Sequence, residues 1–188
     1  MRLSKPRIAP VDMTALDDDQ KEVLEPFGQG LGLLNIFKTM ARTPKALKRF
    51  NVWGGYILGR GTSLAPRERE LVILRTGWLC RSGYEWVQHR RIGLQSGLSE
   101  EEIAAIKLGP DAPIWTAVEA AMLRAADELI SNHFVSDMTW SELGGLSEKQ
   151  RMDLVYTVAQ YTQVSMILNS FGVQLDEGQT LDPDLDRR

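Results

Sequence analysis

The chain has 188 residues, 43% of them apolar, which suffices for the core of one domain or of two tightly packed helical units. A net charge of −3 argues against nucleic acid as the main partner. No apolar run approaches the roughly 20 residues of a membrane span, and none follows the first basic residues as in a secretory signal. The single cysteine, Cys80, excludes an intramolecular disulfide and fits a reducing compartment, so we expect a cytoplasmic protein.

The first half of the chain is punctuated by glycine and proline. Residues 14–28 predict a short amphipathic helix, and the glycines of 28–32 predict a loop. This loop is not a phosphate loop, because no Lys-Ser/Thr pair follows it. Pro44 is placed to open a helix over 45–58, and Pro66 opens the next one.

Three later helices begin with the pattern of a capping box, in which a serine is followed three residues later by Glu or Gln. These starts are Ser82, Ser99 and Ser147, and they predict helices over about 82–97, 99–107 and 147–169. An alanine-rich stretch predicts a further helix over 117–132, and 136–143 a short helix or turn.

No segment shows the alternation of a strand, so the chain is predicted to be all-α with short connections between antiparallel neighbours. We expect an N-terminal segment with a short helix at 1–30, a helical domain at 31–175 and a mobile acidic tail at 176–188. The stretches 66–95 and 117–169 share a loose plan that suggests a duplicated helical hairpin.

Candidate chemistry concentrates between Glu70 and His89. On a helix, Glu85 and His89 lie one turn apart on the same face, and a carboxylate beside an imidazole can orient and charge it for proton transfer. Structural roles compete with this interpretation. Ser82 and Glu85 would also serve as helix caps, Glu70 belongs to a charged run, and His89 could be a surface residue.

Other side chains have weaker claims. Glu70, Glu85 and His89 could hold a metal, but we expect none. Tyr84 and Trp86 are more typical of packing than of chemistry. A substrate carboxylate could be held by Arg75, Arg90 or Arg91. Cys80 is expected to be a small buried residue directed away from the Glu85/His89 face. His133 is expected to lie near the end of a helix, where a histidine interacts favourably with the helix dipole.

Several segments together resemble the carboxymuconolactone decarboxylase family. They are Pro66 to Arg75, Tyr84-Glu-Trp-Val-Gln-His89, Gly97 to Ile103, and shorter stretches at Leu34 to Phe37 with Pro44, Val135 to Trp140 and Met166 to Val173. The resemblance covers most of residues 30–175. It implies an AhpD-like helical fold that assembles into trimers or hexamers, with sites near subunit boundaries.

The alkyl hydroperoxidase D type within this family carries a Glu, a Cys-x-x-Cys pair and a His four residues later. Glu70 and His89 match the Glu and the His, whereas Ser82 and Glu85 occupy the cysteine positions. The departure removes the thiol pair needed for disulfide-based peroxide reduction, and leaves a carboxylate–imidazole site.

The resemblance therefore implies a cofactor-free lyase that acts on a small lactone or related carboxylic acid, as in the breakdown of aromatic compounds. His89 would be the proton donor, Glu85 would orient it, Glu70 would complete the network, and Ser82, Tyr84, Trp86 and Arg90 would contact the substrate. Two alternatives stay open. One is a peroxidase of the antioxidant type that acts through Cys80, and the other is a non-catalytic helical assembly module.

Overall fold

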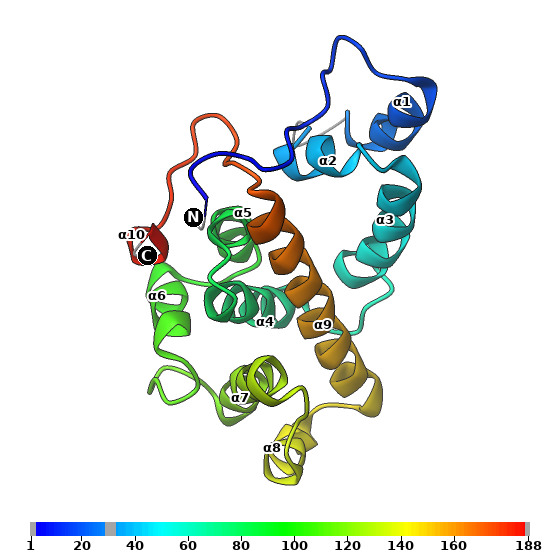
Figure 1. Ribbon diagram of the computed structural model, residues 1–188. Helices are drawn as coiled ribbons and strands as arrows, with labels where there is room; N and C mark the ends of the chain where they lie inside the picture. The colour runs from blue at the N-terminus through cyan, green and yellow to red at the C-terminus, as the bar shows by residue number, and fades with distance from the viewer. Residues whose placement is uncertain (1–2, 29–32, 187–188) are drawn as a thin grey trace.

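The computed structural model describes residues 3–28 and 33–186, and within these ranges the chain is helical with no strand (Figure 1). The all-α prediction is confirmed. Among the described helices, none is both long and apolar enough to cross a bilayer. The helices are α1 (Asp18–Leu24), α2 (Asn35–Met40), α3 (Pro44–Leu58), α4 (Pro66–Leu79), α5 (Gly83–Gln95), α6 (Glu100–Leu108), α7 (Ala117–Asn132), α8 (Asp137–Glu142), α9 (Glu148–Phe171) and α10 (Pro183–Asp186), with 3₁₀ turns at Glu25–Phe27 and Leu143–Gly145.

Helix α4 is the centre of the fold. It packs against α5, α6, α7 and α9, and the run from Glu70 to Gly77 is buried. A helix that is surrounded on all sides has no solvent face, which is why its apolar residues form a continuous run in place of a stripe. The two charged members of that run, Glu70 and Arg75, therefore need partners inside the protein.

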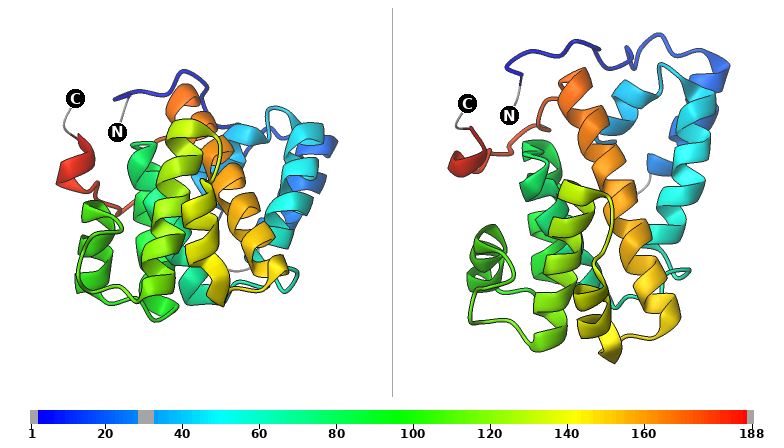
Figure 2. Two further views of the ribbon diagram at one scale, coloured as in Figure 1. Left: turned by 90° about the horizontal axis from the view of Figure 1, so that it is seen from below. Right: turned by 60° about the horizontal axis from the view of Figure 1, so that its bottom comes forward.

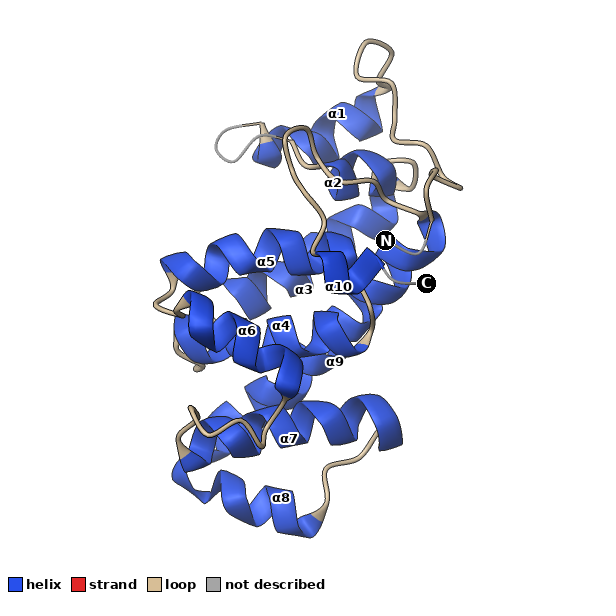
Figure 3. Cartoon of the chain, turned by 90° about the vertical axis from the view of Figure 1, so that its left-hand side faces the viewer, coloured by secondary structure: helices blue, strands red, loops and turns tan. Residues whose placement is uncertain are grey.

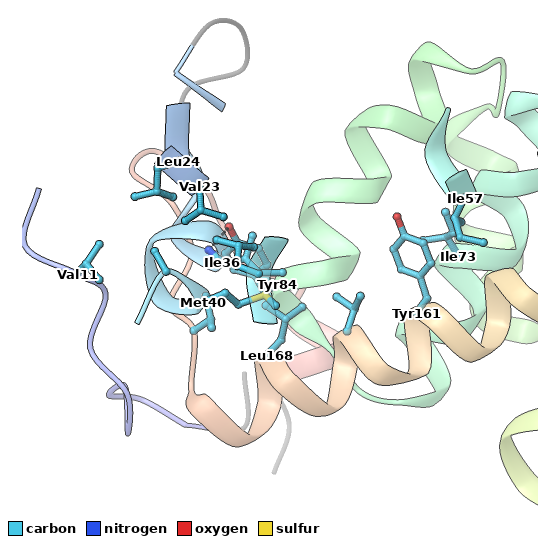
Figure 4. Packing of buried hydrophobic residues seen from close by; sticks show 14 residues of the cluster. Val11, Val23, Leu24, Ile36, Met40, Ile57, Ile73, Tyr84, Tyr161 and Leu168 are labelled. Carbon is cyan, nitrogen blue, oxygen red and sulfur yellow. Dashed lines mark hydrogen bonds between the residues drawn. The ribbon is translucent and has the colours of Figure 1, made fainter. Parts of the chain in front are cut away.

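The remaining helices cover this centre from two ends. Figure 3 shows α1 and α2 at one end and α7 and α8 at the other, and the long α9 connects the two. Figure 2 shows α9 running beside α7 and α3, which it contacts. One apolar cluster joins α2, α3, α5 and α9 through Ile36, Ile57, Tyr84 and Tyr161 (Figure 4). Two further clusters lie around α7 and around α6.

Capping explains most helix starts. Ser99 and Ser147 form the predicted capping boxes, and Asp17 forms another for α1, so that helix begins four residues later than Thr14. The box predicted at Ser82 is wrong. The Ser82 side chain makes no capping bond, and Glu85 turns away from the helix start to bind Ser165.

Two short helices were missed by sequence reasoning. Helix α2 has no side-chain cap of its own; instead, Asp176 accepts a hydrogen bond from the Asn35 backbone N–H at 2.7 Å. Helix α10 lies in the acidic tail that we expected to be mobile. This tail is tied to the body through Asp176 and through Asp182, which accepts from the Trp86 indole N–H at 3.1 Å. The proposed hairpin duplication and the domain limits stay predictions, and most of the 28–32 loop lies outside the described residues.

Candidate active site

A buried carboxylate holds the imidazole of His89. Glu70 extends from α4 toward α5, is fully buried, and places Oε2 2.6 Å from His89 Nδ1. Its other oxygen lies 3.3 Å from the Arg69 guanidinium. When Glu70 is ionised it can only accept, and the hydrogen between the two groups then belongs to Nδ1. The second ring nitrogen, Nε2, is thereby left for other chemistry.

The edge-to-face contact with Tyr161 fixes the plane of the same ring. The two ring centroids are 4.8 Å apart and the planes meet at 87°. Tyr161 extends from α9 toward Ile57 and Ile73 (Figure 4). Burial, together with the negative charge of Glu70, raises the pKa of its phenol, so Tyr161 stays protonated.

Glu85 occupies a different position from the one predicted. We expected it to orient His89, but that contact is made by Glu70. The Glu85 carboxyl lies between α4 and α9, where Oε2 accepts a hydrogen bond from the Ser165 hydroxyl at 2.8 Å. A methyl group on Gly77 would come within 2.9 Å of Oε1, so the glycine leaves the room this carboxyl needs.

Burial raises the pKa of Glu85 well above its ordinary value, and the Ser165 hydrogen bond only partly opposes this. The residue is 2% exposed, and its Oε1 has no hydrogen-bond partner among the described residues. Glu85 is therefore a neutral acid at moderate pH, capable of donating a hydrogen bond.

His89 and Glu85 share a cavity of about 450 Å³. Its walls are mainly aromatic and aliphatic side chains from α2, α3, α5 and α9, among them Ile36, Phe37, Phe50, Ile57, Val164 and Leu168. Few polar groups interrupt them: Tyr84, Glu85, Gln88, His89, Arg91, Gln160 and Tyr161. An apolar cavity with a few polar groups is typical of a site for a small organic molecule.

The predicted substrate-contacting residues separate into two groups. Tyr84 lines the cavity, and its hydroxyl donates to Asp176 at 2.7 Å. Ser82, Trp86 and Arg90 do not line it. Trp86 packs against Trp78, and Arg90 pairs with Glu100 at 2.6 Å on the surface. Ser82 is fully buried, and its hydroxyl has no partner among the described residues.

The three candidate arginines also separate. Arg75 is held by Asp127 at 2.6 Å and by backbone carbonyls of α6. Arg90 is held by Glu100. Arg91 is exposed, lines the cavity and pairs with no acidic side chain in the described part of the chain. It is therefore the arginine placed to receive a carboxylate.

Gln88, Gln160 and Tyr161 were missed by sequence reasoning. Gln88 precedes His89 directly and could have been suspected from that position. Gln160 and Tyr161 lie more than 70 residues downstream on α9, and only the packing of α9 against α5 brings them to the cavity. No local pattern marks them.

Cys80 and His133 lie elsewhere. Cys80 is half-buried rather than buried and lines a second cavity with Ser165 and Asn169. His133 follows the last residue of α7, which confirms its predicted position near a helix end, and it adopts the left-handed conformation with φ at 59°. Within residues 3–28 and 33–186, no three His, Cys, Asp or Glu side chains gather in a group that could hold a metal ion.

Comparison with known proteins gives a family match and a fold. Residues 44–128 match the Carboxymuconolactone decarboxylase family, and this segment contains Glu70, Glu85 and His89. None of the curated proteins matches the chain in sequence.

Several solved structures share the fold. A peroxidase-related protein with an AhpD core from Ralstonia eutropha JMP134 has a TM-score of 0.79 at 19% identity, with 92% of this chain and 93% of that chain covered. A peroxidase-related protein from Silicibacter sp. TM1040 has a TM-score of 0.76 at 15% identity, with 97% of both chains covered. The debrominase Bmp8, solved with 2,3,4-tribromopyrrole, has a TM-score of 0.73 at 16% identity, with 93% and 94% covered. The AhpD-like fold is thus established.

Proposed function

We propose that this protein, whose residues 44–128 match the carboxymuconolactone decarboxylase family, is an enzyme that removes CO2 from a small lactone or related carboxylic acid by proton transfer at His89. The observation that carries the proposal is the 2.6 Å contact between Glu70 and His89 Nδ1, on the wall of an apolar cavity. The family match supports an enzyme, and the geometry supports proton transfer.

Decarboxylation breaks the bond between the carboxylate carbon and the substrate. CO2 leaves, and the electron pair of that bond stays on the remaining carbon, delocalised into an adjacent unsaturated group. A proton from His89 Nε2 then forms the new C–H bond, and water returns a proton to the ring. Glu70 stabilises the charged imidazolium beforehand and keeps the ring oriented.

The cavity assists the step in two ways. Arg91, at the exposed side of the wall, can bind a carboxylate and so orient the acid. The surrounding aromatic and aliphatic side chains favour neutral CO2 over the carboxylate from which it forms. The neutral Glu85 acid, rather than orienting His89, can donate a hydrogen bond to a substrate oxygen.

The test uses the only two histidines of the chain. His89→Asn should lower CO2 release from a panel of lactone and β-keto acids by about 100-fold or more. His133→Asn, at the exposed end of α7, should leave the rate unchanged. Glu70→Gln should lower the rate and change its pH profile, since it removes the charge that stabilises the imidazolium. Full activity of His89→Asn would contradict the proposal.

A second candidate function is peroxide reduction at Cys80, favoured by the fold shared with peroxidase-related proteins and by the exposure of Cys80 to its own cavity. The thiolate would attack one peroxide oxygen, giving a sulfenic acid and water, and an external thiol would reduce it through a mixed disulfide. Cys80→Ser should then abolish peroxide consumption and leave CO2 release intact.

A further inference from the structure

Three residues that line the cavity of His89 each carry a buried side-chain oxygen without a partner among the described residues. These oxygens are Glu85 Oε1, Gln88 Oε1 and Gln160 Oε1, and their residues are 2%, 5% and 3% exposed. Buried polar atoms are almost always hydrogen-bonded in folded proteins. Three exceptions among the residues that line one cavity indicate that their partner is a molecule that binds there.

The polarity of Gln88 is fixed by its surroundings. Its amide nitrogen donates to Asp176 Oδ2 at 2.8 Å and to Gln179 Oε1 at 3.0 Å. Both neighbours are acceptors, so the amide cannot be reversed, and the oxygen without a partner must be Oε1. Gln88 therefore presents an acceptor, which only a hydrogen-bond donor can satisfy.

Gln160 lies on α9 beside Tyr161, and its Oε1 has no hydrogen-bond partner among the described residues. Methionine or leucine would fill the same space without burying a polar group. An amide at this position does not serve stability, which points to a role in binding.

The ligand that supplies this hydrogen-bond donor must otherwise be largely apolar. The walls around the two glutamines are mainly aromatic and aliphatic, and Arg91 is the arginine among the lining residues. A simple carboxylic acid would satisfy Arg91 and leave both amide oxygens unpaired. A cyclic acid that also carries a hydroxyl group could pair its carboxylate with Arg91 and donate its hydroxyl to a glutamine oxygen.

We propose that the cavity selects compact cyclic carboxylic acids that bear a hydroxyl group, with the hydroxyl donating to Gln88 or Gln160 and the carboxylate facing Arg91. This inference rests on the proposed function in one respect: it takes the His89 cavity to be the binding site. It concerns binding, and it holds or fails whether or not CO2 is released.

The experiment measures binding of two nearly isosteric probes, 4-hydroxybenzoate and 4-methylbenzoate, with the 2- and 3-hydroxy isomers added to cover other donor positions. Calorimetry should show at least one hydroxybenzoate binding wild-type protein about tenfold more tightly than 4-methylbenzoate. In Gln160→Met this preference should shrink to about twofold or less, while 4-methylbenzoate binds as before.

A matched control separates binding from folding. Gln163 lies on the same helix but is exposed, so Gln163→Met should keep the wild-type preference. Gln160→Met should unfold at the same or a higher temperature than wild type, since it removes an unpaired buried amide. A loss of preference together with unchanged or raised stability is not expected of a merely structural residue.

Other results would overturn the specificity. Equal binding of hydroxyl and methyl probes to wild-type protein would do so, as would an unchanged preference in Gln160→Met or no binding of any probe at millimolar concentration. CO2 release without a hydroxyl preference would refute the specificity alone. A hydroxyl preference without CO2 release from any acid would refute the reaction alone.

Discussion

Two buried carboxyl groups in this protein have opposite surroundings. Asp153, on α9, accepts hydrogen bonds from the Tyr56 hydroxyl, from the backbone and side chain of Ser63, and from Lys149, all between 2.6 and 2.7 Å. Burial alone would raise the pKa of Asp153, but these bonds outweigh it and lower the pKa to about 2. Glu85 has a single partner in Ser165, and burial raises its pKa.

The difference distinguishes buried polar groups that stabilise the fold from buried polar groups that are available to a ligand. Around Asp153 each carboxylate oxygen is occupied, and the group joins α9 to the α3–α4 connection. Around the His89 cavity, the oxygens of Glu85, Gln88 and Gln160 are left open. Unpaired buried groups destabilise a fold, and three of the residues that carry them line this cavity, in agreement with the proposed binding of a hydroxyl donor there.

The largest expected effect is the loss of stability on removing the Asp153 carboxylate. Asp153→Ala should lower the free energy of unfolding by about 3 kcal/mol, because four donor groups lose this acceptor. The part of the loss that depends on the charge should be complete well above pH 3.8, the ordinary pKa, and should disappear as the pH falls through about 2, where the native carboxylate is protonated. Urea denaturation across this range measures it. A loss that does not depend on pH would show that the charge of Asp153 is unimportant.

The next effect is a pH slope at Glu85. Above about pH 4.5 the unfolded chain releases the Glu85 proton while the folded chain keeps it, so this group lowers stability as pH rises. Glu85→Gln removes this titrating group. As the pH rises, the free energy of unfolding of the variant minus that of wild type should increase by about 1.4 kcal/mol per pH unit until the folded wild-type carboxyl ionises. Parallel stability curves for the two proteins between pH 5 and 7 would mean that Glu85 is ionised in the fold.

The smallest effect compares two neighbouring glycines in α3. A methyl group on Gly54 or on Gly55 would meet no atom within 4 Å, so alanine at either position should stabilise the helix by about 0.5–1 kcal/mol. Only Gly54 lines the cavity. Gly54→Ala should therefore change the affinity for cyclic acids, and Gly55→Ala should not. Equal binding in both variants would place the ligand away from α3.

Much of the fold was predictable because its signals are local. Ser99 and Ser147 cap their helices within three residues, and Pro44 and Pro66 open theirs, so the sequence alone places four helix starts. Helix α2 was missed because its N-terminus is satisfied by Asp176, 141 residues away. A cap supplied from such a distance leaves no pattern next to the helix.

The site was predictable where residues share a helix and not where they meet across helices. Glu85 and His89 reach the same cavity, as their four-residue spacing predicts. The spacing did not reveal that Glu70, from the preceding helix α4, would hold the imidazole. Ser82 and Trp86 lie close in sequence to Glu85, yet they point elsewhere in the helical turn, and Gln160 reaches the cavity only through tertiary packing.

The most direct test of the central claim is nitrogen NMR of histidine-labelled protein, with His89→Asn to assign the two rings. We predict that neutral His89 carries its hydrogen on Nδ1, held by Glu70. We also predict that binding of a cyclic acid shifts the Nε2 signal of His89, while the His133 signals stay unchanged. A hydrogen on Nε2 in the neutral ring, or a His89 signal insensitive to a bound acid, would contradict the role of Glu70 and the placement of His89 in the chemistry.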